Sequence, residues 1–163
     1  MNQPPSANAF KQGKHDHARC VAEALQDAQA RCRARGLRLT RIRHRVLEII
    51  WRGHQPVKAY DILDELSRNG QKTAPPTVYR SLDFLVQAGL VHRVETLNAF
   101  VGCPHGQGDH SAQLLICSQC GTIAEIDDPL IRTVLIEGGE RHGFDVKPQT
   151  LEIRGLCPVC QEA

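Results

Sequence analysis

Two pairs of cysteines carry the clearest chemical signal in this chain of 163 residues. Cys117 and Cys120 form one CxxC pair, and Cys157 and Cys160 form another, with 36 residues between the pairs. Each pair can place two sulfurs on one ion from a single turn, and four thiolates make a closed tetrahedral site. Such a site fits structural zinc better than catalysis, because no coordination position is left open. The ion should attach the C-terminal residues to the strands near Cys117.

Two other interpretations of these pairs are weaker. In the first, the pairs are two unrelated turns with free thiols. In the second, one of them is a redox pair like that of thioredoxin. Paired CxxC spacing argues against free thiols. Neither pair sits between the strand and the helix of a βαβ unit, which disfavours the redox interpretation.

A second, looser group of possible ligands combines nitrogen, sulfur and oxygen donors, all of which zinc accepts. Any one of these residues alone is typical of a surface or hydrogen-bonded side chain. Together they surround a Gly-rich stretch, so an ion that they bound would couple the segments on either side of it. The group comprises His92, Cys103, His105, His110 and Glu125.

Charge is divided unevenly along the chain. Up to Arg93 there are 16 basic and 8 acidic residues, whereas from Val94 onward there are 4 and 10. A basic N-terminal half favours a polyanionic partner, usually nucleic acid, although a solvated basic surface is the alternative.

The elements of the basic half predict a winged helix-turn-helix. Residues 1–14 lack periodicity and are expected to form a disordered tail. Helices are expected over about 17–35, 41–52, 59–68 and 75–88, from helix-favouring composition, apolar periodicity and terminating glycines. Two short strand-like runs on either side of residues 96–98 then predict a hairpin.

The fourth predicted helix is the candidate for reading DNA. The N-terminal part of a recognition helix faces base edges in the major groove, and Arg is the commonest reader of guanine. We expect Arg80 to fill that role, with Thr77 and Tyr79 nearby and Tyr60 on the preceding helix. The alternative for Tyr79 is a half-buried helix aromatic.

After Cys103 the pattern changes to strands and one helix. The predicted fold class is therefore α+β, with a winged-helix domain over 15–95, a hinge over 96–110 and a small αβ domain over 111–163.

Several functions are disfavoured by the sequence. No apolar run approaches the ~18 residues that span a bilayer, and the N-terminus lacks the apolar centre of a secretory signal, so we expect a cytosolic protein without membrane contact. No HExxH, Ser/His/Asp set or phosphate-binding Gly loop is present, so we expect neither an enzyme nor a small-molecule substrate. A hydrolase that uses the hinge ion and a zinc-storage module are the remaining alternatives.

The motifs resemble those of the ferric uptake regulator superfamily, most closely its zinc uptake regulator branch. The resemblance covers about residues 18–162 and rests on AYDILDEL, PPTVYRSLDFLVQAGLVHRVE, the two CxxC pairs and the terminal GLCPVC. It implies a transcriptional repressor of zinc uptake genes that binds double-stranded operator DNA as a zinc-loaded homodimer. The C-terminal αβ domain would mediate dimerisation.

The resemblance also assigns ligands for two zinc ions per chain. The structural ion maps to Cys117, Cys120, Cys157 and Cys160, and the regulatory ion maps to His92, Cys103, His110 and Glu125. It also points to Tyr60 and Arg80 as DNA contacts.

The choice of metal rests on the chemistry of one ligand and on one departure from the iron-sensing branch. The thiolate of Cys103 favours zinc over manganese or iron. The segment GQGDHSAQLLIC replaces the His-rich run of that branch, which disfavours the alternative of iron or peroxide sensing. A third metal site, present in some relatives, would have only His105, Asp109 and His142.

Overall fold

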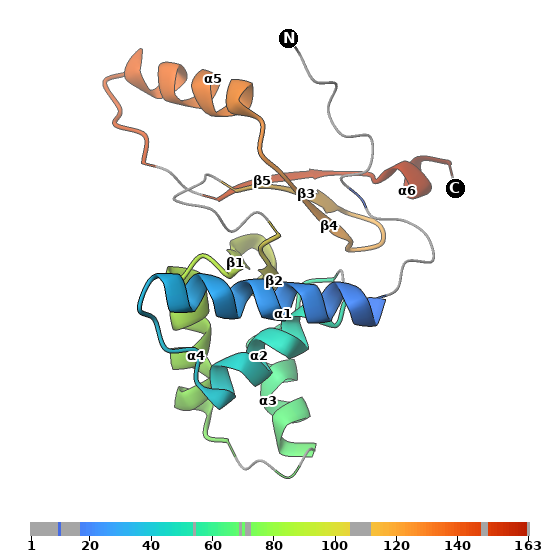
Figure 1. Cartoon of the computed structure of the whole chain (residues 1–163). Helices are drawn as coiled ribbons and strands as arrows, with labels where there is room; N and C mark the ends of the chain where they lie inside the picture. The colour runs from blue at the N-terminus through green and yellow to red at the C-terminus, as the bar shows by residue number, and fades with distance from the viewer. Residues whose placement is uncertain are drawn as a thin grey trace. The chain divides into compact units, whose positions relative to one another are not determined.

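The computed structural model describes residues 10, 17–53, 55–68, 70, 73–104, 112–147 and 150–162. Those between Gln12 and Gln107 form one compact unit, and those from Gly108 onward belong to a second. The first unit holds four helices and a hairpin, and the second holds a small mixed sheet with two helices (Figure 1). The predicted α+β class is confirmed. No helix among the described residues is long and apolar enough to cross a membrane.

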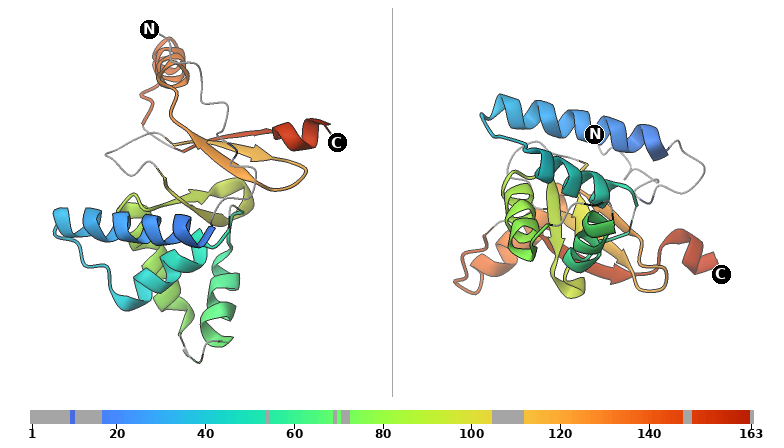
Figure 2. Two further views of the ribbon diagram at one scale, coloured as in Figure 1. Left: turned by 45° about the vertical axis from the view of Figure 1, so that its right-hand side comes forward. Right: turned by 90° about the horizontal axis from the view of Figure 1, so that it is seen from below.

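The four helices of the N-terminal unit follow the predicted pattern. They are α1 (His17–Ala34), α2 (Arg41–Trp51), α3 (Ala59–Arg68) and α4 (Pro75–Gln87). The Thr40 hydroxyl accepts from the N–H of Arg43 and caps α2, while Pro75 and Pro76 suit the first turn of α4. Helix α2 contacts the other three helices (Figure 2), and its buried aliphatic side chains belong to the hydrophobic core of this unit.

The wing is an antiparallel hairpin of β1 (Val91–Val94) and β2 (Ala99–Gly102), joined by the short helix η1 (Glu95–Leu97). Asn98 closes the connection with a left-handed φ of 46°, which Asn tolerates better than most residues. Residues 96–110 are the stretch expected to form the hinge. Four of them, Ala99–Gly102, are strand β2 and pair along their whole length with β1.

The C-terminal unit is built on a three-stranded sheet in the order β4-β3-β5. Strand β3 (Gln113–Cys117) runs antiparallel to β4 (Ile123–Ile126) and parallel to β5 (Leu151–Gly155). Helix α5 (Pro129–Glu140) makes the crossover, and α6 (Pro158–Glu162) ends the described chain. The buried side chain of Gln113 holds the start of α5, since its amide bonds both the N–H and the carbonyl of Asp128.

Candidate metal centres and nucleic-acid interface

The two CxxC pairs are brought together by the pairing of β3 with β5. Cys117 is the last residue of β3 and lies opposite Gly155, the last residue of β5, so the chain reaches Cys157 two residues after β5 ends. The turn after β3 closes through a hydrogen bond from the Gly121 N–H to the Cys117 carbonyl at 3.0 Å. Gly121 has a φ of +75°, a conformation that glycine adopts without steric cost. This turn directs Cys120 back toward the second pair.

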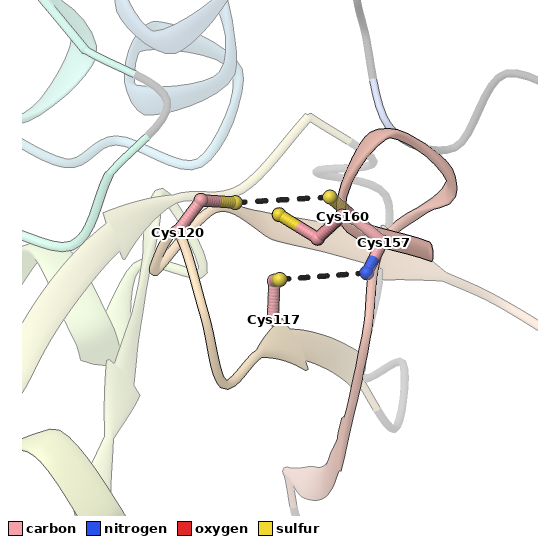
Figure 3. A group of neighbouring side chains, drawn as sticks. All are labelled: Cys117, Cys120, Cys157 and Cys160. Atoms are coloured by element: carbon pink, nitrogen blue, oxygen red, sulfur yellow. Dashed lines mark hydrogen bonds between the residues drawn. The ribbon is translucent and has the colours of Figure 1, made fainter. Parts of the chain in front are cut away.

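The four sulfurs fit a single tetrahedral zinc ion. Cys117 and Cys120 approach from the β3–β4 turn, while Cys157 and Cys160 approach from the start of α6 (Figure 3). All four sulfurs lie within 4.8 Å of one another, and those of Cys120 and Cys157 are 3.7 Å apart. Zn–S bonds of about 2.3 Å in a tetrahedron require S···S distances of about 3.8 Å. The observed spacing therefore matches a shared ion and excludes a disulfide between Cys120 and Cys157.

The thiol pKa values show an electrostatic conflict that a cation would remove. The backbone N–H groups of Cys120 and Cys157 lower the pKa of Cys117 to about 6, and the Thr122 hydroxyl lowers the pKa of Cys120. Burial, followed by the neighbouring sulfurs, raises the pKa of Cys160 to about 12. Four thiolates cannot coexist here at neutral pH unless a positive charge sits among them.

The N-terminal unit places two of the predicted regulatory ligands side by side. His92 lies on β1, and Cys103 directly follows β2, where its N–H bonds the Leu90 carbonyl at 3.0 Å. A ring nitrogen of His92 lies within 4.8 Å of the Cys103 sulfur, and both residues are buried. An imidazole and a thiolate on one hairpin form the kind of ligand pair that zinc takes.

The other two predicted regulatory ligands, His110 and Glu125, come after this hairpin in the chain. Glu125 lies on β4 of the C-terminal unit and is half-buried. His110 lies outside the described residues, as do His105 and Asp109 of the possible third site. His142, the remaining member of that site, is exposed just beyond the end of α5.

The residues expected to read DNA line the outer surface of α3 and the first turns of α4. Tyr60 is 72% exposed and Tyr79 is 54% exposed, so both rings are accessible on this surface, and an exposure near one half leaves the half-buried alternative for Tyr79 open. Arg80 is exposed and Thr77 is half-buried. The opposite side of α4 packs into the core through its buried residues Val78, Ser81, Leu82 and Leu85.

The Arg80 guanidinium differs from those of Arg45 and Arg52 in its ion pairing. Arg45 pairs with Glu48 at 2.6 Å, and Arg52 pairs with Glu48 and Glu65. Within the described part of the chain, no hydrogen bond or ion pair holds the side chain of Arg80. Arg80 is therefore available to a base edge or a phosphate.

Sequence reasoning missed a large apolar surface on the C-terminal unit. No residue of α5 is buried, although Leu130, Val134, Leu135 and Ile136 all lie on it with between 38% and 67% of their surface exposed. Phe144, just after the helix, is 67% exposed. The apolar run PLIRTVLIEGG was the available signal, since the short strands beside it cannot cover so many side chains.

A family profile and the curated proteins that are similar to this chain agree with each other. The profile of the ferric uptake regulator family matches residues 34–154. The zinc uptake regulation protein of Escherichia coli K12 is 36% identical over 141 residues, which cover 86% of this chain and 82% of that protein.

Two solved structures are also similar. The crystal structure of holo XcZur is 42% identical with a TM-score of 0.79, and the alignment covers 86% of this chain and 99% of that one. A zinc uptake regulator complexed with zinc and DNA is 33% identical with a TM-score of 0.77, over 91% and 97% of the two chains.

Proposed function

Because the chain belongs to the ferric uptake regulator family, we propose that it is a zinc-responsive transcriptional repressor that binds operator DNA to control zinc uptake genes. It is a regulator and not an enzyme. One observation carries the proposal: the same winged-helix unit holds the exposed Arg80 on α4 and the buried pair His92 and Cys103 on its wing. The residues proposed to contact DNA and two of the four proposed regulatory ligands thus lie within one unit. As a DNA-binding repressor, the protein is expected to act in the cytoplasm.

Two zinc ions per chain account for the two ligand sets. The sulfurs of Cys117, Cys120, Cys157 and Cys160 would hold a structural ion that ties α6 to the end of β3. His92 and Cys103, with His110 and Glu125, would hold the regulatory ion. Zinc supplies positive charge and a cross-link at both positions, with no role as a Lewis acid for a substrate.

We assign DNA binding to residues 15–95, the hinge to residues 96–110 and dimerisation to residues 111–163, which form the αβ domain. The boundary between the two compact units falls between Gln107 and Gly108, inside this proposed hinge, which supports a division in this part of the chain. A regulatory ion with ligands from both domains would restrict the movement of one relative to the other. Zinc then needs only to bind the DNA-competent arrangement more tightly, and DNA must raise zinc affinity by the same factor.

The C-terminal unit supplies the surface for a homodimer. The exposed apolar residues of α5 and Phe144 form a surface that a second copy of the chain would cover. Strand β5 lies at the edge of the sheet, and its residues 153–155 are exposed, so its outer edge can pair with a partner strand. A dimer also gives the two recognition helices that a palindromic operator requires.

Substitution of Val134 by Glu should convert the protein to monomers, because a carboxylate in a buried apolar interface is strongly unfavourable. Val134 is 64% exposed on α5, so the isolated chain should tolerate the change. Sedimentation velocity measures the outcome. The control is Thr133→Glu, since Thr133 lies on the polar side of the same helix with Glu137 and Glu140. A Val134→Glu protein that stays dimeric at micromolar concentration would place the interface elsewhere.

Metal-dependent DNA binding tests the proposed function directly. Duplexes would be selected from a random-sequence pool with the zinc-loaded protein and then compared in gel shifts with zinc, iron(II), manganese(II) or chelator. A repressor of zinc uptake genes should bind the selected duplex with zinc only. Equal binding with iron or manganese would favour the alternative of an iron or peroxide sensor. Failure to bind DNA with any metal would favour a zinc-storage module.

Substitution of Arg80 by Ala should weaken binding to the selected duplex by about 1–3 kcal/mol and relax its sequence preference, because a base contact is lost. Fluorescence anisotropy on the selected and a scrambled duplex measures both effects. The exposed Arg33 of α1 gives a control, since Arg33→Ala removes the same charge from the same unit. If Arg80→Ala weakens both duplexes equally, Arg80 contacts phosphate only.

A further inference from the structure

The single tryptophan of the chain lies against the hairpin that carries the two regulatory ligands. Trp51 is the last residue of α2, and Gly102 is the last residue of β2, directly before Cys103. A methyl group built on Gly102 would overlap with Cε2 of the Trp51 indole and lie 2.7 Å from its Cζ2 and Nε1 atoms. The φ of Gly102 is not in the left-handed region, so close approach of the indole is what requires glycine here.

The register of the hairpin puts the indole and the ligands on opposite faces. His92 pairs with Val101, and side chains alternate along a strand, so His92, Val101 and Cys103 share one face. Gly102 pairs with Val91 and belongs to the other face, together with the core residue Phe100. The Trp51 indole therefore lies directly behind the strand segment that presents Cys103.

We infer that Trp51 and Gly102 form a positioning contact for the regulatory zinc ligands. The indole supports the exit of β2 from behind and sets the position of the Cys103 backbone, whose N–H bonds the Leu90 carbonyl. The distance from the Cys103 sulfur to the imidazole of His92 then depends on this contact. Groups that orient metal ligands from outside the coordination sphere typically change metal affinity by about 10- to 100-fold. The inference rests on the proposed regulatory site.

Substitution of Gly102 by Ala should weaken the binding of the second zinc ion by about 10- to 100-fold, because the added methyl group displaces either the strand or the indole. Affinity is measured by zinc titration against a chromophoric chelator, on dimeric protein that already holds one zinc ion in the four-cysteine site. The matched control is Gly53→Ala, since a methyl group on Gly53 would meet only the Gln55 nitrogen at 3.7 Å. Unchanged second-site affinity in Gly102→Ala, or an equal loss in Gly53→Ala, overturns the inference.

A second substitution separates positioning from general damage to the fold. Trp51→Leu removes the ring that meets the new methyl group, so the variant Trp51→Leu/Gly102→Ala should bind the second zinc more tightly than Gly102→Ala alone. Trp51→Phe should keep most of the wild-type affinity. If Gly102→Ala does not fold, Trp51→Leu alone decides the matter, and unchanged second-site affinity in it overturns the inference.

Tryptophan fluorescence supplies a readout that a purely structural contact would not move. Zinc binding at His92 and Cys103 should change the Trp51 emission at the stoichiometry of the second ion, and Cys103→Ser should abolish that change. If Cys103→Ser still binds two zinc ions, the proposed regulatory site is wrong and the inference falls with it. If Cys103→Ser loses the second ion while Gly102→Ala binds it normally, only the positioning role is wrong.

Discussion

Substitution of Cys117 by Ser should leave the C-terminal unit without a stable fold. Cys117 is buried at the end of β3, and its sulfur accepts a hydrogen bond from the Cys157 N–H at 3.4 Å. Ligand thiolates are not assembled in an unfolded chain, so zinc-binding energy becomes folding energy, about 10–16 kcal/mol in zinc-finger peptides. The sheet of this unit is small, and its buried apolar side chains lie on β3 and β4, since no residue of α5 or α6 is buried. The structural ion should therefore supply much of the stability of this unit.

The N-terminal unit should survive the loss of the structural ion, because it has its own core of apolar side chains from α1, α2, α3, α4 and the wing. Cys117→Ser should therefore give a monomeric protein with helical circular dichroism but without the structural zinc, measured by metal analysis and sedimentation. Cys20→Ser, on the half-exposed surface of α1, is the control for loss of a thiol. A stable, dimeric Cys160→Ser protein that merely holds one zinc ion fewer would contradict a folding role.

The four-cysteine site was predictable because its evidence is local. A CxxC spacing fixes two sulfurs on one turn, whatever the rest of the chain does. The helices of the N-terminal unit were predictable for a similar reason, since apolar periodicity and caps act over a few residues.

Features that depend on contacts between distant segments were not predictable from spacing. Leu47 of α2 is fully buried because three other helices contact this helix, which the apolar periodicity of α2 alone does not show. The contact of Trp51 with Gly102 joins residues that are 51 positions apart in the chain, and no motif in the sequence indicates it. The ligands around the hinge gave a weak signal for the same reason, since they come from separate elements.

Substitution of Cys103 by Ser should abolish the response of operator binding to zinc. A coupling between two ligands of one protein is typically about 5- to 150-fold in affinity, and this whole factor should disappear. The thiolate of Cys103 is the soft ligand of the regulatory set, and a hydroxyl is a poor substitute for it on zinc. His92→Ala should act in the same way, since His92 is the neighbouring ligand on the hairpin. Gel shifts with and without zinc measure the effect.

The expected protein is a folded dimer that keeps its structural zinc and binds operator DNA weakly at every zinc concentration. His110→Ala and Glu125→Gln should show the same loss less completely, whereas His105→Ala should change little. His44→Ala on α2 serves as the matched histidine control, because His44 belongs to neither ligand set. Reciprocity adds a second test: operator DNA should tighten zinc binding to the wild type and leave Cys103→Ser unaffected. A Cys103→Ser protein with undiminished zinc-responsive binding would place the sensor elsewhere, with His105 and His142 as the next ligands to replace.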